Sequence, residues 1–447
     1  MVKVTTKIKQ GSVLKKPARA PPMPDGVEPV LDLEIGASDT STQNCCFYSV
    51  PKTLVELYGT RCFKPRAVSI GHYNCKKFKY AENEPLLVIK KDKQQFCNIL
   101  LSHARKSMEN LTDIIRPEVE NIEFKSKKDD LFLAMLVLDG CFILELFRIL
   151  GKSKKIESNH PLASVEVWAI PRFYRDLLLL ENQIPFVVLK KLFETSKMPD
   201  EDYPLSLLAL RFFNKVMPRS EEELRKMSVH LNESSLHLLD LVRRSFITPD
   251  LGQPPTGRNS ETLPGIHYIT KLVKAGIKIK LREAADSFLA VTFKNGVIEM
   301  PKITVNYFMH SFVVNCRAFE QLDNRSSKHI TTYAYFLDCL VNTAKDVEYL
   351  YECNIFDNYD MDNSVVVQFI NSFGKEMVVE TDQFYLYNFF ENVNRRYNDK
   401  WKVQWAGFKL MYFNTPWSFI SLLAAGVLLV LTFLQTYYTI YAYMNPK

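Results

Sequence analysis

The stretch DDLFLAMLVLDGCFILELFRIL, residues 129–150, is apolar on nearly every side of a helix. A helix without a polar face must be covered by other elements or by lipid. Asp139 and Glu145 interrupt the stretch, and each charge would cost roughly 2.5–3.5 kcal/mol at the centre of a bilayer. We therefore predict a central helix of a large α-helical core, broken at Asp139 and Gly140, and a membrane span is the alternative.

Further helices are predicted on both sides of this stretch. Pro185 lacks a backbone N–H, so it is expected to end one helix and start the next within residues 175–194. Residues 247–265 are rich in Pro, Gly, Ser and Thr, which indicates a boundary between lobes. Apolar residues recur at helical spacing in residues 92–108, 205–216, 234–246, 308–322, 329–343, 362–374 and 384–397.

Strand character occurs in one place, FLAVTFKNGVIEMPKITV at residues 288–305. Asn295 and Gly296 lie between two apolar runs, and this dipeptide favours the tight turn of a β-hairpin because both residues tolerate positive φ. The β content is therefore expected to be one small hairpin.

The C-terminal stretch WSFISLLAAGVLLVLTFLQTY, residues 417–437, is long and apolar, and positions 410 to 446 contain no charged residue. At helical rise this stretch spans roughly 30 Å, the thickness of a hydrocarbon core. Trp417 lies at one end and Tyr437 and Tyr438 at the other, as aromatic residues do at both membrane interfaces. We predict a transmembrane helix at residues 416–441 with a short tail at 442–447, and a buried core helix is the alternative.

Together these patterns predict a mainly α fold. It consists of a multi-helix globular domain at residues 45–413 with one small β-hairpin, plus a single C-terminal transmembrane helix. Ser418, Ser421 and Ala425 lie at i, i+3 and i+7 of that helix, and small residues on one face let two helices approach closely. A homodimer through the transmembrane helix is the corresponding partner prediction, although GxxxG is absent.

The net charge of +7 is concentrated at the N-terminus. The basic residues before the first acid, Asp25, are Lys3, Lys7, Lys9, Lys15, Lys16 and Arg19. The remaining chain is close to neutral, so we predict no nucleic-acid partner. Residues 1–40 are basic and rich in Pro, which predicts a disordered tail, with attraction to anionic membrane lipid as the alternative.

The orientation in the membrane is predicted from charge and cysteine. No apolar segment precedes residue 30, so the C-terminal span is interpreted as a tail anchor. Lys400, Lys402 and Lys409 precede the span and Lys447 follows it, which places the large domain in the cytoplasm. Nine cysteines without a CxxC pair agree with a reducing compartment. The sequence does not distinguish the plasma membrane from an endomembrane.

The usual catalytic motifs are absent: there is no Walker loop, GxGxxG, HExxH or GxSxG. His72 and Cys75 form the closest His–Cys pair, but a zinc site needs three or four ligands. We therefore predict no catalytic residue, no cofactor and no metal, and a protein that is not an enzyme.

Polar residues interrupt apolar runs in two clusters, which are Glu181, Asn182 and Gln183 before Pro185, and Glu320 with Gln321. Buried carboxylates with raised pKa values could act as general acids, so an enzyme that uses Glu181 and Glu320 in a helical cleft is one hypothesis. The preferred interpretation is structural: the side chains cap helix ends and pair with arginines such as Arg175 or Arg317.

At these clusters the sequence resembles a plant family known as domain of unknown function 247, or the UPF-0481 proteins. RDLLLLENQIPFVVL at residues 175–189 is similar to the family signature. The resemblance covers residues 45–443. Five further segments occur in the same order as in the family: CCFYSVP, VSIGHYN, MLVLDGCFILELFR, VKAGIKIK and AFEQL. His72 stands where the family usually has Pro, and Val314 and Cys316 also depart from its pattern.

The resemblance implies a plant-specific protein with one C-terminal span and no established activity. Some grass members of the family are linked to self-incompatibility as pollen-side recognition determinants. We therefore expect a membrane-tethered interaction or recognition protein with an unknown protein partner. A cytoplasmic domain could not meet an extracellular partner, so the orientation and the self-incompatibility role are in tension.

Overall fold

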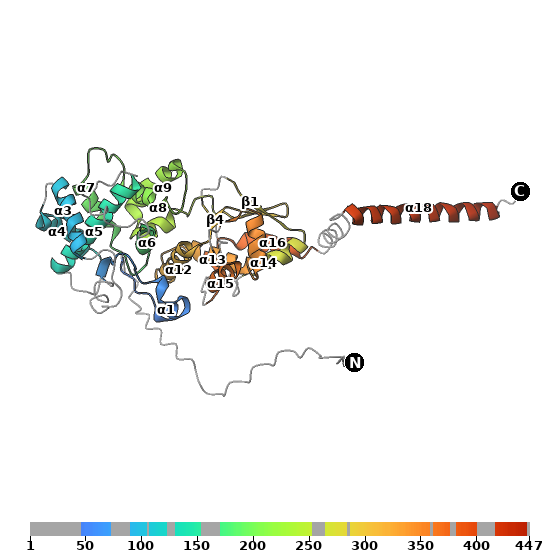
Figure 1. Ribbon diagram of the computed structural model, residues 1–447, viewed down its shortest axis with the longest axis horizontal. Coiled ribbons are helices and arrows are strands. Elements are labelled where there is room, and N and C mark those ends of the chain that lie inside the picture. The colour runs from blue at the N-terminus through green and yellow to red at the C-terminus, as the bar shows by residue number, and fades with distance from the viewer. Residues whose placement is uncertain are drawn as a thin grey trace, which may run out of the picture. The chain divides into compact units, whose positions relative to one another are not determined.

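The computed structural model of the chain describes residues 46–72, 90–104, 107–122, 130–152, 170–252, 264–283, 287–357, 361–375, 381–399 and 416–444. The described part is mainly α-helical with a few short strands, as expected (Figure 1). The predicted tail at residues 1–40 lies outside the described residues, as does most of the predicted boundary at 247–265.

Helix α5, Asp130–Leu146, is the predicted central helix, and it is buried along most of its length. It runs through Asp139 and Gly140 without a break, so that part of the prediction is wrong. The Asp139 carboxylate accepts a hydrogen bond from the Gly71 N–H (2.8 Å) and forms an ion pair with Lys93. These partners satisfy the buried charge, and the helix continues into a π-helical turn, η3 (Phe147–Gly151).

The elements around α5 come from the first half of the chain. Helices α3 (Lys90–Ala104), α4 (Met108–Glu120) and α7 (Phe186–Thr195) pack against it. The remaining elements of this half are α1 (Lys52–Tyr58), η1 (Thr60–Cys62), α6 (Ile170–Asp176), α8 (Leu205–Phe213), α9 (Glu221–Ser234) and α10 (Leu238–Arg244).

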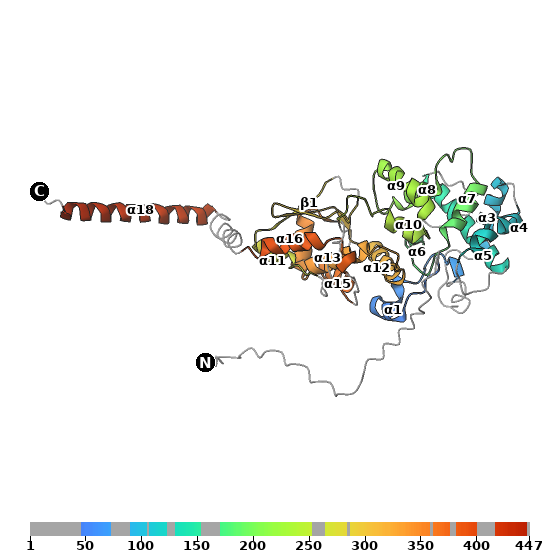
Figure 2. The ribbon, with the colours of Figure 1, turned by 180° about the vertical axis from the view of Figure 1, so that it is seen from behind.

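The second half is built around helix α12, Tyr307–Leu322. This helix contacts α6, η1 and α10, so it connects the two halves, as both views show (Figures 1 and 2). The other helical elements of the second half are α11 (Ile269–Lys274), α13 (His329–Leu340), α14 (Ala344–Glu352), α15 (Asn363–Phe373), η6 (Thr381–Gln383) and α16 (Tyr387–Tyr397).

The predicted hairpin is confirmed. Strands β2 (Thr292–Lys294) and β3 (Val297–Met300) pair antiparallel across Asn295 and Gly296, whose φ angles are 52° and 79°. Positive φ at both turn residues is what this tight turn requires. The β content exceeds one hairpin, because β1 (Lys278–Leu281) adds to β3 in parallel and β4 (Ile303–Thr304) pairs with β5 (Phe356–Asp357).

Helix α18, Pro416–Met444, is the long apolar helix expected at the C-terminus. Within the described residues it is the one helix long and apolar enough to cross a membrane, over Ile420–Tyr441. None of that span is buried against the rest of the described chain. The alternative of a buried core helix is therefore wrong for this stretch.

Candidate functional site

The segment RDLLLLENQIPF, residues 175–186, is called the signature segment here. Helix α6 ends inside it at Asp176, and α7 begins at Phe186 with Pro185 at the N-cap position. The expectation that a helix starts after Pro185 is confirmed, but the preceding helix ends at Asp176, so the expectation that Pro185 also ends or kinks that helix is wrong. The residues between the two helices follow an irregular path that buries residues 177–180, so their polar neighbours need partners inside the protein.

Asp176 binds the backbone of a segment that is distant in sequence. Its Oδ2 accepts hydrogen bonds from the N–H groups of Arg66 (2.7 Å), Ala67 (2.6 Å) and Val68 (3.2 Å). Its Oδ1 pairs with Arg175 at 2.8 Å. Burial raises the pKa of the Asp176 carboxyl, and Arg175 and the N–H groups act in the opposite direction. The sequence analysis did not single out this acid, although its place directly before four leucines was the available signal.

Asn182 and Gln183 also bond to backbone groups. The Asn182 Oδ1 accepts from the Ile70 N–H (2.6 Å), and its amide donates to the Val68 carbonyl (3.1 Å). The Gln183 Oε1 accepts from the Leu239 N–H (3.2 Å) at the start of α10. Both side chains are buried. They therefore join the signature segment to residues 68–70 on one side and to α10 on the other.

Glu181 bonds to a third segment. Its Oε1 accepts from the Val50 N–H (3.0 Å) and the Ser49 hydroxyl (3.2 Å). Gly71 packs so closely that a Cβ there would lie 2.2 Å from the Gln183 carbonyl oxygen, and its φ of +71° also favours glycine. The signature segment thus binds residues 66–71 and Val50 through backbone groups and Ser49 through its hydroxyl, which supports the structural interpretation.

Glu320 is also bonded to a backbone. It is fully buried near the end of α12, and its carboxylate accepts hydrogen bonds from the N–H groups of Ile330 (3.2 Å) and Thr331 (2.8 Å). These groups belong to the first turn of α13, whose N–H groups have no partner within the helix. Glu320 therefore caps α13 from a neighbouring helix. Gln321 follows it on α12 and is half-buried.

The polar clusters were expected to pair with arginines such as Arg175 or Arg317, and Glu320 does pair with an arginine, although with neither of these two. Arg175 pairs with Asp176, and Arg317 donates to the hydroxyl of Tyr58. The partner is instead an arginine of α10. Its distance in sequence from Glu320 explains why local spacing could not identify it.

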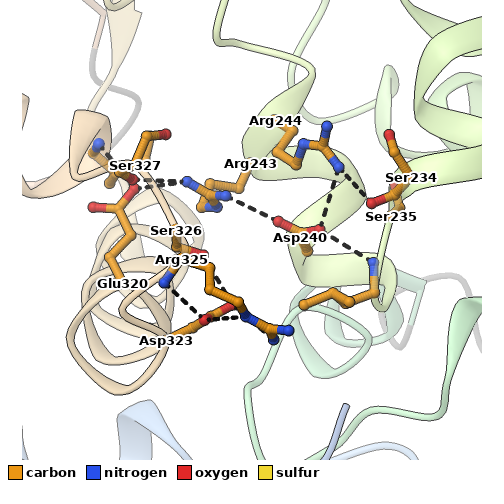
Figure 3. Close-up of polar contacts among 12 residues, drawn as sticks. Ser234, Ser235, Asp240, Arg243, Arg244, Glu320, Asp323, Arg325, Ser326 and Ser327 are labelled. Atoms are coloured by element: carbon orange, nitrogen blue, oxygen red, sulfur yellow. Dashed lines mark hydrogen bonds and ion pairs between the residues drawn. The ribbon is translucent and has the colours of Figure 1, made fainter. Parts of the chain in front are cut away.

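That partner, Arg243, is the centre of a buried network between α10 and α12 (Figure 3). Its Nη1 donates to Glu320 (3.0 Å) and to the Ser327 carbonyl (3.0 Å), and its Nη2 donates to Asp240 (2.9 Å). Burial alone would lower the pKa of Arg243, but Glu320 and Asp240 more than offset that effect and raise it. The Arg243 guanidinium therefore stays protonated, and its ion pairs with Asp240 and Glu320 connect the two halves of the domain.

A pocket of about 500 Å³ opens beside this network. Arg244 and His230 lie on the side of α9 and α10, with 3.4 Å between the Arg244 Nη2 and the His230 Nε2. Arg325 lies on the opposite side, where its Nε donates to Asp323 (3.0 Å) (Figure 3). We call this the Arg244–Arg325 pocket.

The carboxylates of the Arg244–Arg325 pocket already have partners. Asp240 accepts from the Leu236 N–H (3.1 Å) and from Arg243, and Asp323 accepts from Arg325 and from the Ser326 hydroxyl (3.3 Å). A general base must be able to reach a substrate proton. The arrangement is better suited to recognition of hydrogen-bond acceptors than to proton transfer.

Glu181 and Glu320 do not line this pocket. Their carboxylates are bonded to backbone groups of different segments. This geometry gives no support to the hypothesis that the two act as a catalytic pair.

The fold brings Cys62 and His310 together, a pair that the sequence analysis did not find. The Cys62 Sγ lies 3.9 Å from the His310 Nδ1, and the His310 Nε2 lies 3.4 Å from the Ser372 hydroxyl. Burial raises the pKa of the Cys62 thiol and lowers that of His310 to about 4. A nucleophilic cysteine needs the thiolate, so these shifts oppose a catalytic role.

Metal ligands are not clustered in the part of the chain that the structure describes, where no group of three His, Cys, Asp or Glu side chains could hold an ion. The ring of His72 packs against Phe132 (5.7 Å between centroids), and Cys75 lies outside the described residues.

Comparison with known proteins identifies the family. The sequence profile named DUF247, described as "Plant protein of unknown function", matches residues 47–431. This chain belongs to the DUF247 family. The UPF0481 protein At3g47200 of Arabidopsis thaliana is 34% identical to it over 451 residues, covering 94% of this chain and 90% of that protein. The putative UPF0481 protein At3g02645 of the same plant is 21% identical, covering 93% and 94%. No solved structure matches.

The DUF247 match includes the signature segment, Glu320, the Arg244–Arg325 pocket and the first part of α18. The family resemblance derived from LLENQIPF and AFEQL is therefore confirmed. Membership of DUF247 supplies no activity, because the family description states none.

Proposed function

We propose that this chain is a membrane-tethered plant interaction protein, in which α18 crosses a bilayer once and the helical domain binds a protein partner without catalysis. The composition and exposure of α18 carry the proposal. It contains no charged residue, and large side chains such as Leu428 and Phe433 are exposed along it. Exposed apolar surface of this extent marks an interaction site, and the helix is long enough to span the hydrocarbon core.

The aromatic residues at the ends of α18 support contact with lipid head groups. Trp417 is 79% exposed, and Tyr437 and Tyr438 are 62% and 65% exposed. Indole and phenol side chains combine an apolar body with a polar tip, which favours the interface of a bilayer. We assign these three residues to the two membrane interfaces.

A cytoplasmic position of the helical domain is part of the proposal. Three lysines within about 20 residues of the span precede it and one follows, and the positive-inside rule places the more basic flank in the cytoplasm. Six of the described cysteines form no disulfide, which is consistent with a reducing compartment; these are Cys62, Cys97, Cys141, Cys316, Cys339 and Cys353. The charge and the thiols do not distinguish the plasma membrane from an internal one.

The Arg244–Arg325 pocket is the proposed site of partner binding. Arginine is enriched at energetically important positions of protein interfaces, because its planar group donates several hydrogen bonds. The Arg325 side chain is 53% exposed and the Arg244 side chain 26%, while Asp323 and His230 contact them. We infer that a partner segment with carboxylate or carbonyl acceptors docks there.

Self-association through α18 is a second part of the proposal. Ser421 and Ala425 lie on one face, and Thr432 continues that face at i+7 from Ala425. The Thr432 hydroxyl donates to the Leu428 carbonyl (2.8 Å), so its donor is satisfied within the helix. Close packing of small side chains, rather than new hydrogen bonds, would then hold two copies together.

A recognition role related to self-incompatibility is implied by the family resemblance alone. Such a role with an extracellular partner requires the helical domain outside the cytoplasm, the reverse of the orientation proposed above. One topology experiment therefore separates the two forms of the proposal.

The experiment is protease protection of the full chain in sealed vesicles with the cytoplasmic side outward, with a tag at each end. We expect the N-terminal tag and the domain to be digested, while carbonate leaves the C-terminal fragment in the membrane. Protection of the domain, with glycan on the Asn110 or Asn232 sequon, would reverse the orientation and favour cell-surface recognition. Release of the whole chain by carbonate would overturn the tether.

A further inference from the structure

A second pocket, of about 370 Å³, lies where the segment between α8 and α9 meets the end of α10, strands β1 and β4, and α12. Its volume falls in the range of about 300–1,000 Å³ that small-molecule sites occupy. Much of its lining is apolar and includes Met217, Phe246, Leu281, Phe288, Ile303 and Met309. We call it the Arg219 pocket, after the cation that lines it.

Arg219 has no carboxylate partner within the described residues. Its Nη1 and Nη2 donate to the carbonyl and hydroxyl of Ser245 (2.8 and 3.0 Å), and its Nε–H is buried without a partner. The guanidinium lies 4.1 Å from the centroid of the Phe246 ring. Burial lowers the pKa of Arg219 to about 10, with Glu223 acting in the opposite direction. Buried charges are ordinarily paired with an opposite charge. The Arg219 guanidinium instead has only neutral hydrogen-bond acceptors, both in Ser245.

The other cations of the pocket already have acidic neighbours. The Lys302 Nζ lies 2.9 Å from Asp357, and the Arg282 Nη2 lies 3.9 Å from Asp250. Arg219 therefore supplies the one positive charge that the described part of the pocket leaves unmatched. Glu283 also lines the pocket and would repel a second negative charge on a ligand.

We propose that the Arg219 pocket binds a small monocarboxylate with an apolar body, its carboxylate beside the Arg219 guanidinium and its body against the apolar lining. The single unmatched cation selects one negative charge over two. The lining selects an apolar body, because each buried apolar group is removed from water. Planar guanidinium and carboxylate groups also match in geometry.

The test uses the full chain in lipid nanodiscs and 4-(trifluoromethyl)benzoate, observed by ¹⁹F NMR, with empty nanodiscs as the blank. The neutral match is 4-(trifluoromethyl)benzyl alcohol, which has the same apolar body. We expect saturable binding of the benzoate at one site and binding of the alcohol weaker by roughly 10- to 100-fold, the range for hydrogen bonds to charged groups. Equal binding of the two probes, or no saturable binding of the benzoate, would overturn the proposal.

Variants locate the site. Arg219→Met is expected to weaken benzoate binding by a similar factor, whereas Arg219→Lys keeps the charge and should retain most of it. Val216→Trp, at a residue that lines the pocket, should block binding while leaving Arg219 in place. Arg317→Met is the matched control, because Arg317 is also buried, has an unpartnered Nε and lies outside this pocket. Undiminished binding in folded Arg219→Met and Val216→Trp would place the probe elsewhere and contradict the assignment.

Discussion

Helices α5 and α18 are similarly apolar in sequence, and the protein surrounds one and leaves the other exposed. The difference lies in their charges. Asp139 and Glu145 of α5 have charged partners in the core, Lys93 and Arg148, and α18 contains no charge. A charge inside an apolar helix therefore indicates a protein environment that can pair it, whereas its absence over a long helix favours lipid.

The largest expected effect comes from placing charges in α18. Leu428→Lys with Leu431→Lys should remove the chain from the membrane fraction, because each lysine at the centre of a span costs roughly 2.5–3.5 kcal/mol. Leu131→Lys is the control in α5, at a side chain that is 81% exposed. Carbonate extraction measures the outcome. A double variant that remains carbonate-resistant would show that α18 is not the tether.

The next effect comes from removing a charge beside α5. Lys93→Met leaves Asp139 buried without its cation, and we expect a loss of about 3–5 kcal/mol in the free energy of unfolding. Urea unfolding of the full chain in nanodiscs, followed by circular dichroism, measures the loss. Adding Asp139→Asn should recover part of it, since the amide carries no charge. A Lys93→Met variant of unchanged stability would mean that the ion pair does not hold α5 in the core.

Acidification should destabilise the helical domain without affecting the membrane association of α18. His237 is fully buried, its Nδ1 caps α10 by accepting the Asp240 N–H (3.2 Å), and burial lowers its pKa from 6.5 to about 4. Protonation therefore favours the unfolded state. The stability that neutral His237 contributes is fully present above pH 6.5 and is lost as the pH falls towards 4. The loss over that interval is about 3 kcal/mol in the free energy of unfolding.

Between pH 6.5 and 4.5 the buried histidines lower stability as the pH falls, whereas Asp176 and Asp338, whose carboxyl pKa values are raised by burial, act in the opposite direction. Glu201 and Asp346 have lowered pKa values, so their contributions are lost only below their ordinary values of 4.5 and 3.8. We expect stability to fall across this window and membrane association to stay constant, because α18 has no group that titrates there. His237→Asn keeps an acceptor for the cap and should flatten the slope. An equal slope in this variant would assign the pH dependence to other groups, such as His310 or His329, whose pKa values are also lowered to about 4.

Features set by neighbouring residues could be predicted from the sequence. Pro185 stands directly before α7 because a residue without a backbone N–H is tolerated where a helix begins, and Asn295 and Gly296 form a hairpin turn because both accept positive φ. The structural role of the Glu181 cluster could also be predicted, since polar side chains beside buried leucines must find partners.

Features that depend on contacts between residues distant in sequence could not be predicted. The break predicted at Asp139 is absent because Lys93 and Gly71, far away in sequence, satisfy its carboxylate. Strand β1 was missed because its partner β3 is a parallel neighbour reached across an intervening segment. The pairing of Arg243 with Glu320 and the approach of Cys62 to His310 likewise depend on which helices pack together.

The smallest effect compares one substitution in both helices. In α5, a Cβ at Gly140 would lie 2.4 Å from the Leu192 Cδ1, and in α18 a Cβ at Gly426 would have no atom within 4 Å. Crowding a packed core costs about 1–3 kcal/mol, and replacing helical glycine by alanine gains about 1 kcal/mol. Gly140→Ala should therefore lower the free energy of unfolding of the helical domain by about 1 kcal/mol, whereas Gly426→Ala changes only α18 and should leave the unfolding of that domain unaffected.

This comparison also tests whether α18 pairs with a second copy. Gly426 is one residue from Ala425 and so points about 100° away from the small-residue face, on which Ala425 lies. Gly426→Ala should leave cross-linking between copies unchanged, while Ala425→Leu should reduce it by crowding the face. Equal cross-linking in both variants would exclude that face as the contact. If Gly426→Ala destabilised the domain as much as Gly140→Ala, α18 would be packed against protein, and the distinction between the two helices would fail.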